Sequence, residues 1–498
     1  MMLLCLLARK QHPIMKRTAL KHILKKHSVQ TGVVLLLTLL ITVVSSVSFF
    51  LTQFNAVDTR LIRQQQTEKA LQYAKQALLG YAARYYDFSQ PPFTNPDGRG
   101  RFGFLPCPDT GVSIEGREAG NCGIKNQSAI GKLPWLTLAI PPLFDESNEC
   151  LWYAVSGSYK NSSGARTDML NDDNAGFFEV TTASRATGSH PDERAVAVII
   201  APHLVQTGQT RPSRTATETC GSNYNFRDYI ESVVENSTAS PPHTFAKINN
   251  VNVAYKIEVF NESGNDQIIY ITRKELFDFI NKRKDFKQLM HCYTQLLAHC
   301  VAIPARQQVV ADPVANDKRL SFAASVALSD YENDGSYVEL ADTLVGRLPN
   351  TLTLPLGNPA IINLITACSI SDIITSDLDT TCQNTAIDTS DFTKFSRLWQ
   401  NKKSQLFYEV AENYKRTAVL PIIPCDGSSS CVDGIYIAKI TFAGSQLSGQ
   451  TRTASPLDTT ETRHDINNYL IGTVETASDT NDISYCIKED LTVEHCTP

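Results

Sequence analysis

Acidic residues are absent from the first 32 positions, which carry seven basic side chains: Arg9, Lys10, Lys16, Arg17, Lys21, Lys25 and Lys26. Charge of either sign is then absent from Gly32 to Phe54, a segment rich in Leu, Val and Ile. As a helix rising 1.5 Å per residue, this segment spans about 30 Å, enough for the hydrocarbon core of a bilayer. We therefore expect a basic cytoplasmic leader, residues 1–32, followed by a single-pass membrane anchor with everything after about residue 55 exported.

Two other interpretations of the apolar segment are a buried helix of a soluble protein and a cleaved secretory signal. A secretory signal has an apolar region of about 7–15 residues and ends in a small-residue cleavage site. The segment is longer than that, and no Ala-x-Ala pattern follows it. The basic flank directly before it also favours a retained anchor over a buried helix.

Basic residues are scarce beyond the leader. Without its seven, the 46 basic residues of the chain fall to 39 against 51 acidic ones, a formal charge of −12. Nucleic-acid binding needs clustered Lys and Arg, so a nucleic-acid partner is not expected. The chain also lacks a Walker loop, an H-E-x-x-H motif and a G-x-S-x-G elbow. The usual nucleotide, zinc-protease and hydrolase signatures are thus absent, and we predict no catalytic site and no cofactor; a periplasmic enzyme outside those classes is a further alternative.

Twelve of the 13 cysteines follow the apolar segment: Cys107, Cys122, Cys150, Cys220, Cys292, Cys300, Cys368, Cys382, Cys425, Cys431, Cys486 and Cys496. An even dozen beyond a membrane anchor suits up to six disulfides in an oxidising periplasm. Short loops could close between Cys425 and Cys431 and between Cys107 and Cys122, whereas the spacing does not determine the other pairs. His291-Cys292 and His299-Cys300 raise the possibility of zinc. Eight helical residues would separate the two cysteines by about 12 Å, however, which favours separate disulfides, or one bridge if the helix ends near Ala298.

No proline or glycine interrupts residues 33–79. Apolar residues recur every three or four positions after the anchor, which predicts one continuous transmembrane and amphipathic helix over 33–86. Alternating apolar runs such as Ala195-VAVIIA and Val251-NVAYKIEVF then predict strands, and Thr272 with Glu275 has the spacing of a capping box that starts a further helix. The expected fold class is α+β, with antiparallel sheet after the long helix.

Four blocks of sequence recur in the same order. Residues 151–160 (LWYAVSGSYK) match 406–415 (LFYEVAENYK), and 195–211 (AVAVIIAPHLVQTGQTR) match 436–452 (YIAKITFAGSQLSGQTR); GKLPWLTL from Gly131 and DYIES from Asp228 recur less closely at Gly346 and Asn468. This order predicts two related, disulfide-rich modules, residues 87–310 and 311–498. Both contain the sequence GQTR, which we interpret as a structural turn, with a binding loop as the alternative.

Asp330, Glu332 and Asp334 alternate as in the start of a calcium-binding loop, with Gly335 next. Position 12 of that pattern is Ala341, where a bidentate glutamate would be needed. A solvated turn is therefore the preferred interpretation, and calcium is a weak candidate.

The basic leader, Gly32 before an apolar start, and the long predicted helix together resemble a type IV prepilin or a type II secretion pseudopilin. The segments Phe104-LPCPDTG, Gly131-KLPWLTL, Cys150-LWYAVSGSYKNS and Ile271-TRKELFDFI are similar to large pilin-like proteins of Gram-negative bacteria. The resemblance implies cleavage by a prepilin peptidase after Gly32, so that Val33 becomes the N-terminus. It also implies partners of the same kind, which pack through the N-terminal helix in the inner membrane.

The sequence departs from the pilin pattern at the fifth mature position, where Leu37 stands in place of the usual glutamate. That glutamate sets the register between neighbouring subunits, so its absence implies a tip or initiating subunit of a pilus or secretion filament. The expected function is thus that of a non-catalytic minor pilin or pseudopilin. A monomeric bitopic surface adhesin or carbohydrate-binding protein is the alternative.

Overall fold

The computed structural model describes most of the chain: residues 28–84, 102–112, 114–162, 169–188, 193–240, 242–248, 251–254, 258–353, 361–367, 378–383, 392–419, 422–425, 427, 429–447, 449–452, 462–470 and 482–496. The chain divides into two compact units, Met1–Gln65 and Gln66–Pro498. We call the second the globular unit. The leader, apart from its last residues, lies outside the described part.

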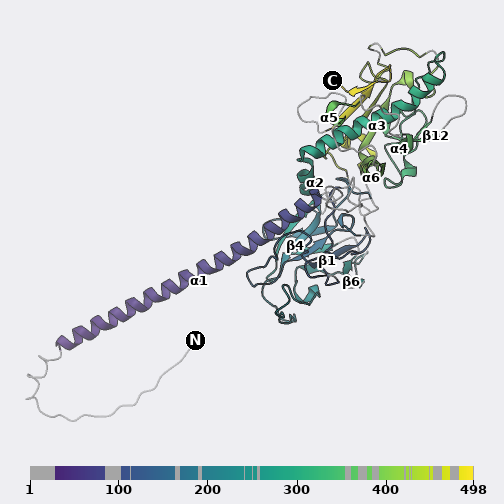
Figure 1. The fold of residues 1–498 in the computed structure, drawn as a ribbon. Helices are drawn as coiled ribbons and strands as arrows, with labels where there is room; N and C mark the ends of the chain where they lie inside the picture. Colours follow the sequence, from purple (N-terminus) through teal and green to yellow (C-terminus); the bar gives the residue numbers. More distant parts are fainter. Residues whose placement is uncertain are drawn as a thin grey trace, which may run out of the picture. The chain divides into compact units, whose positions relative to one another are not determined.

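The predicted long helix is present as α1, Ser28–Arg84 (Figure 1). It is 57 residues long and begins five residues before the predicted start. In the first unit, Gly32–Phe49 is long and apolar enough to cross a membrane, with a mean hydropathy of 2.4 and no residue buried. In the globular unit, one face of α1 is fully buried through Leu71, Ala74, Leu78 and Ala82. Their spacing of three and four residues is that of an amphipathic helix.

A nine-stranded, mostly antiparallel sheet forms the first part of the globular unit, in the order β5-β8-β3-β4-β2-β1-β7-β6 with β9 paired to β4. Only β3 and β8 run parallel among its described pairs. Its strands are β1 (Ser128–Lys132), β2 (Trp152–Val155), β3 (Phe178–Thr181), β4 (Ala195–Ala201), β5 (Val233–Val234), β6 (Phe245–Ile248), β7 (Val251–Ala254), β8 (Glu258–Asn261) and β9 (Gln267–Thr272).

Strand β4 lies at the centre of the packing, with all seven residues buried. Ile199 faces the same core as Leu78 of α1, whereas Val198 and Ile200 face a second core with Trp152. A strand buried on both faces reads as a continuous apolar run, as the sequence here does. The run predicted from Val251 is two strands, β7 and β8, rather than one.

A five-stranded antiparallel sheet forms the second part, in the order β10-β13-β14-β15-β16. The strands are β10 (Val345–Arg347), β13 (Leu406–Val410), β14 (Ala438–Phe442), β15 (Ile483–Ile487) and β16 (Val493–His495); β11 (Thr351–Thr353) and β12 (Ile361–Asn363) form a separate pair. Three shorter helices accompany this sheet: α4 (Leu364–Ala367), α5 (Thr380–Gln383) and α6 (Phe392–Lys402). The α+β class with antiparallel sheet is therefore confirmed.

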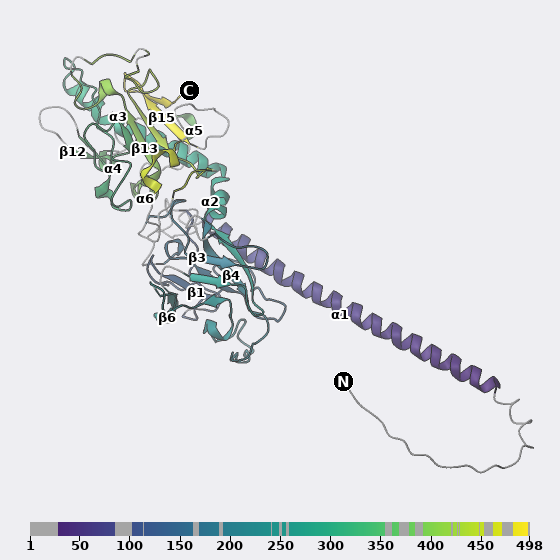
Figure 2. The same cartoon turned by 180° about the vertical axis from the view of Figure 1, so that it is seen from behind.

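The helical stretch expected from Thr272 to Cys300 is two helices, α2 (Arg273–Asn281) and α3 (Lys284–Ala311). Thr272 is the N-cap of α2, because its side-chain oxygen accepts a hydrogen bond from the Glu275 amide at 3.2 Å. Helix α3 packs against β14, β15 and β16 of the second sheet, and both views show it lying along that sheet (Figures 1 and 2). The sequence had assigned this helix to the first module.

Five disulfides lie within the described residues: Cys107–Cys122, Cys150–Cys220, Cys292–Cys382, Cys425–Cys431 and Cys486–Cys496. The two short loops foreseen from the sequence are among them. Cys300 is also disulfide-bonded, and Cys368 lies outside the described residues. Because Cys292 pairs with Cys382 while α3 continues past Cys300, the prediction of separate disulfides along this helix is confirmed.

The N-cap of α2 provides a test of this local structure. Replacing Thr272 with alanine leaves the Glu275 amide without its acceptor and should cost about 1 kcal/mol of unfolding free energy. Urea unfolding of the detergent-solubilised chain, followed by tryptophan fluorescence, measures this loss. Thr272→Ser keeps the acceptor and should unfold like the wild type; equal losses in both variants would contradict the assigned cap.

Candidate functional site

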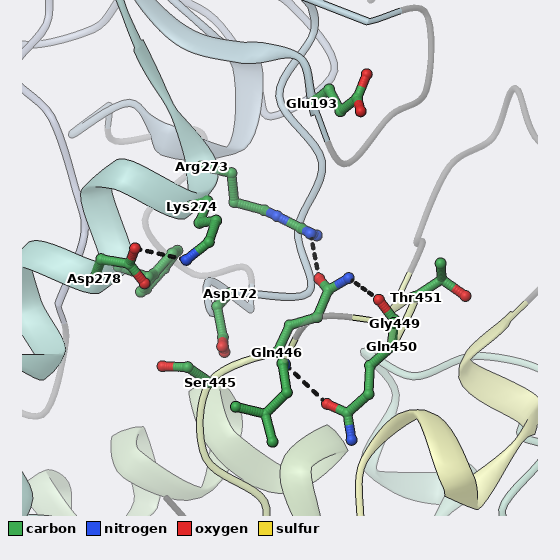
Figure 3. A pocket seen from close by; sticks show the side chains of 12 residues that line it. Asp172, Glu193, Arg273, Lys274, Asp278, Ser445, Gln446, Gly449, Gln450 and Thr451 are labelled. Atoms are coloured by element: carbon green, nitrogen blue, oxygen red, sulfur yellow. Dashed lines mark hydrogen bonds and ion pairs between the residues drawn. The ribbon is translucent and has the colours of Figure 1, made fainter. Parts of the chain in front are cut away.

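A cavity of about 650 Å³ lies between the start of α2 and the loop after β14 (Figure 3). Arg273 and Lys274, from the first turn of α2, line it, and Arg273 points to the loop (Figure 3). Arg273 Nη2 donates to Gln446 Oε1 at 2.6 Å, and Lys274 forms an ion pair with Asp278 at 2.7 Å. The cap at Thr272 fixes where α2 begins, and thereby places both basic residues at the cavity.

The loop wall of this cavity contains the second GQTR turn, Gly449–Arg452. Gly449 has a φ of +89°, a conformation that favours glycine. The Gln450 side-chain oxygen accepts from the Leu447 amide at 3.0 Å, and Gln446 Nε2 donates to the Gln450 carbonyl (Figure 3). Gln446 therefore connects Arg273 of α2 to the turn.

Arg452 lies beneath the turn and is fully buried. Its guanidinium donates to the carbonyl oxygens of Gly444, Asn468 and Tyr469 at 2.6, 2.8 and 3.3 Å, and it lies over the Tyr469 ring at 4.5 Å. Such a planar fork of donors suits several fixed carbonyls at once. These contacts give Arg452 a structural role, in agreement with the prediction that GQTR is a structural turn.

The first GQTR turn, Gly208–Arg211, forms the equivalent hydrogen bonds. Arg211 donates to the carbonyls of His203, Asp228 and Tyr229 at 2.6, 2.8 and 3.1 Å. These acceptors occupy the positions that match Gly444, Asn468 and Tyr469 in the repeated blocks. The cation also lies over the Tyr229 ring, at 4.8 Å.

A fully buried carboxylate, that of Asp173, lies beside the arginine of the second GQTR turn. Asp173 accepts from the Tyr469 hydroxyl at 2.8 Å and lies 4.0 Å from Arg452. Burial raises the pKa of Asp173, and the charge of Arg452 acts against that shift. Beside it, Asn171 donates to the Asn401 carbonyl and to Ser404 Oγ, both at 2.8 Å. Segment 171–174 thus connects the first part of the globular unit to the second.

A second cavity, of about 430 Å³, shares Asp172, Lys274 and Gln446 with the first. We call it the Lys402 cavity, because the last residue of α6 lines it. Lys402 is 4% exposed, and burial lowers the pKa of its ammonium group while Asp172 and Asp173 act against that shift. A buried cation with a perturbed pKa at a cavity wall marks a candidate binding site.

The residues implied by the pilin resemblance lie on α1. Val33 is 60% and Leu37 54% exposed, and among the described residues a side chain at Gly32 would meet open space. None of these observations tests processing or filament register, so both stay predictions.

Two of the three calcium candidates form ion pairs with different lysines. Glu332 forms an ion pair with Lys125, and Asp334 pairs with Lys403. Within the described part of the chain, no three His, Cys, Asp or Glu side chains group so as to hold a metal ion. These contacts give no support to calcium binding by Asp330, Glu332 and Asp334, which stays a prediction.

Comparison of the chain with protein-family models, with curated proteins and with solved structures finds no match. Sequence reasoning found the GQTR turn, because the motif occurs twice. It missed Arg273, Asp172 and Lys402, which carry no repeated motif and meet only in the folded chain.

The pairing of Asp173 with Arg452 can be measured by substitution. Arg452→Met leaves the buried carboxylate without its cation and should cost about 3–5 kcal/mol of unfolding free energy. The combined Asp173→Asn and Arg452→Met variant should lose less than the two single losses together, since the pair acts as one unit. Chemical unfolding of the detergent-solubilised chain supplies all four values.

Arg211→Met is the matched control. It removes the same carbonyl contacts, but the nearest carboxylate, Glu149 at 3.7 Å, has a side chain that is 21% exposed. The loss should therefore be smaller than for Arg452→Met. An equal loss at both arginines would show that Asp173 adds nothing.

Proposed function

We propose that this chain is a non-catalytic, membrane-anchored subunit of a type IV pilus or type II secretion filament, acting at its tip or in its initiation. The supporting observation is α1, a single helix with two kinds of surface. Its residues 32–49 are apolar and exposed, whereas residues 71–83 contribute buried side chains to the core of the globular unit. One continuous helix thus carries both a segment suited to lipid and a segment that packs in a folded head.

Exposed apolar side chains in that segment need a non-aqueous environment. At 1.5 Å per residue, the 18 residues Gly32–Phe49 span about 27 Å, most of the hydrocarbon core of a bilayer. Neighbouring apolar helices would cover the same residues in a filament, so the membrane and other pilin-like subunits are the proposed partners. Ser45, Ser46 and Ser48 are small enough to allow close approach of such a helix.

The disulfides support an exported location for the globular unit. Five described pairs, two of them spanning 70 and 90 residues, would not persist in a reducing cytosol. With the positively charged leader inside, the globular unit lies in the periplasm or at the cell surface in this proposal. Prepilin peptidase would remove the leader after Gly32, and Leu37 would leave the subunit without the usual register contact.

The globular unit is proposed to consist of two copies of one module. Gly131 pairs with Tyr153 and Gly346 with Tyr408, at the same place in β1–β2 and β10–β13. The two GQTR arginines make the same hydrogen bonds, as described above. Because α3 packs on the second sheet, we place it at the start of the second copy, where it corresponds to the buried part of α1; the predicted boundary at residues 310 and 311 then moves to just before Lys284.

The second candidate function is a monomeric bitopic adhesin or carbohydrate-binding protein. A cavity of about 650 Å³ with polar groups on both walls favours it, because small ligands bind in cavities of this size. The two functions differ in how the N-terminus is processed.

Processing after Gly32 is the decisive test of the pilin route. Mass spectrometry of the chain from its native host should find a mature N-terminus at Val33. Gly32→Val should leave the leader attached, because the peptidase recognises the glycine in the family that the chain resembles. An intact start at Met1 or Met2 in the wild type would instead support the simple anchor.

Membrane retention is tested separately by a charge within the apolar segment. Leu40→Arg places a cation at the centre of the span and should cost about 2.5–3.5 kcal/mol of insertion free energy. The protein should then become extractable from membranes by alkaline carbonate. Ile62→Arg, on the same helix but beyond the apolar segment, should stay in the membrane fraction; retention of both variants would contradict the proposed span.

A further inference from the structure

The ammonium group of Lys402 has few partners for a buried cation. Its Nζ donates to Gln405 Oε1 at 3.2 Å, and among the described residues it forms no ion pair. The rings of Phe277, Phe286 and Phe442 lie around it, with centroids 5.7, 5.6 and 5.8 Å from Nζ. An ammonium has three N–H donors, so two of them lack an acceptor in the described chain.

The Gln405 side chain is held by a second hydrogen bond, so it offers Lys402 one acceptor. It is 1% exposed, and its Nε2 donates to Asp172 Oδ1, which directs its oxygen to Lys402. Asp172 itself attracts the ammonium only from beyond ion-pair distance. Burying donors without acceptors is costly, whereas Arg452 nearby satisfies its donors with carbonyls.

The Lys402 cavity offers room for a missing acceptor. Its lining contains four large apolar side chains, Phe286, Met290, Phe442 and Ile483, as well as polar and charged ones. Lys282 and Lys287, on either side of the break between α2 and α3, are exposed and add positive charge to its lining. A ligand that reaches Lys402 therefore meets a buried cation beside an apolar part of the wall, with Asp172, Asp278 and Asp482 elsewhere in the lining.

We propose that the Lys402 cavity binds a small organic monocarboxylate with an apolar body, whose carboxylate accepts from Lys402 Nζ. A carboxylate supplies acceptors for the two unfilled donors, and the apolar body packs on the phenylalanine and methionine side chains. A phosphate dianion fits less well, because its second charge would be placed against the apolar side chains and the carboxylate of Asp172, which line the same cavity. This inference goes beyond the filament role and does not rest on it.

The test uses 3-phenylpropanoate as the probe and 3-phenylpropanamide as its uncharged counterpart. Calorimetric titration of the full chain in lipid nanodiscs should show saturable binding of the acid, and binding of the amide weaker by about tenfold or more, since a charge-assisted hydrogen bond is lost. Empty nanodiscs correct for partition into lipid. Equal affinity for acid and amide, or no binding of the acid, would overturn the proposal.

Lys402→Met identifies the cation. The two side chains are similar in length, and methionine packs well among aromatic rings, so the variant should unfold at the same or higher denaturant concentration. Its affinity for the acid should fall by about tenfold or more. Lys284→Met is the matched control, because Lys284 is exposed on α3 and does not line the cavity; it should bind as the wild type does.

Unchanged binding by a folded Lys402→Met would overturn the assignment. Should that variant fail to fold, Lys402→Gln replaces it, because the amide keeps a donor without the charge. The comparison of acid and amide on the wild-type chain decides the ligand class in either case. Processing at Gly32 is measured independently, so failure of one proposal leaves the other intact.

Discussion

The globular unit depends on hydrogen bonds that two arginine side chains donate to backbone carbonyl groups. A strand that enters a loop leaves carbonyl groups without partners, and a buried carbonyl without a donor is unfavourable. Arg211 and Arg452 each supply several donors in one plane, which fixes the loop after β4 and the loop after β14 against the segments that end in Tyr229 and Tyr469. In the second case the cation also lies near Asp173, so the same side chain contributes to joining the two parts of the unit.

Lys402 differs from Arg211 and Arg452 in how far its hydrogen-bond donors are satisfied. The ammonium is a compact charge whose three donors point in different directions. One glutamine oxygen accepts from it and three phenyl rings surround it, so two donors have no acceptor among the described residues. Its low exposure comes from α2, α3 and β14 together, since each contributes one of the surrounding rings. An incompletely satisfied cation beside a cavity is the kind of feature that proteins keep for a ligand rather than for stability.

The apolar segment of α1 indicates a lipid environment, and the disulfides indicate an oxidising one. Both environments are met by an exported, membrane-held protein. An exposed, uncharged helix surface is stable in lipid and unfavourable in water, and long-range disulfides persist under oxidising conditions. Both follow if the chain is exported and held at a membrane. The long helix then serves the head as well as the anchor, because its last turns supply core residues such as Leu71 and Leu78.

The continuous helix, the α+β class, the cap at Thr272 and the two GQTR turns are predictable from the sequence, because each depends on periodicity, on a local hydrogen bond or on a repeated motif. Only the folded chain shows that α3 packs on the second sheet, that Cys292 pairs with Cys382, and that Asp173 lies beside Arg452. These depend on residues far apart in the chain, whose approach no local pattern encodes. Lys402 is the clearest case: at the polar end of α6 it reads as a solvated lysine, and only the packing of three distant phenylalanines buries it.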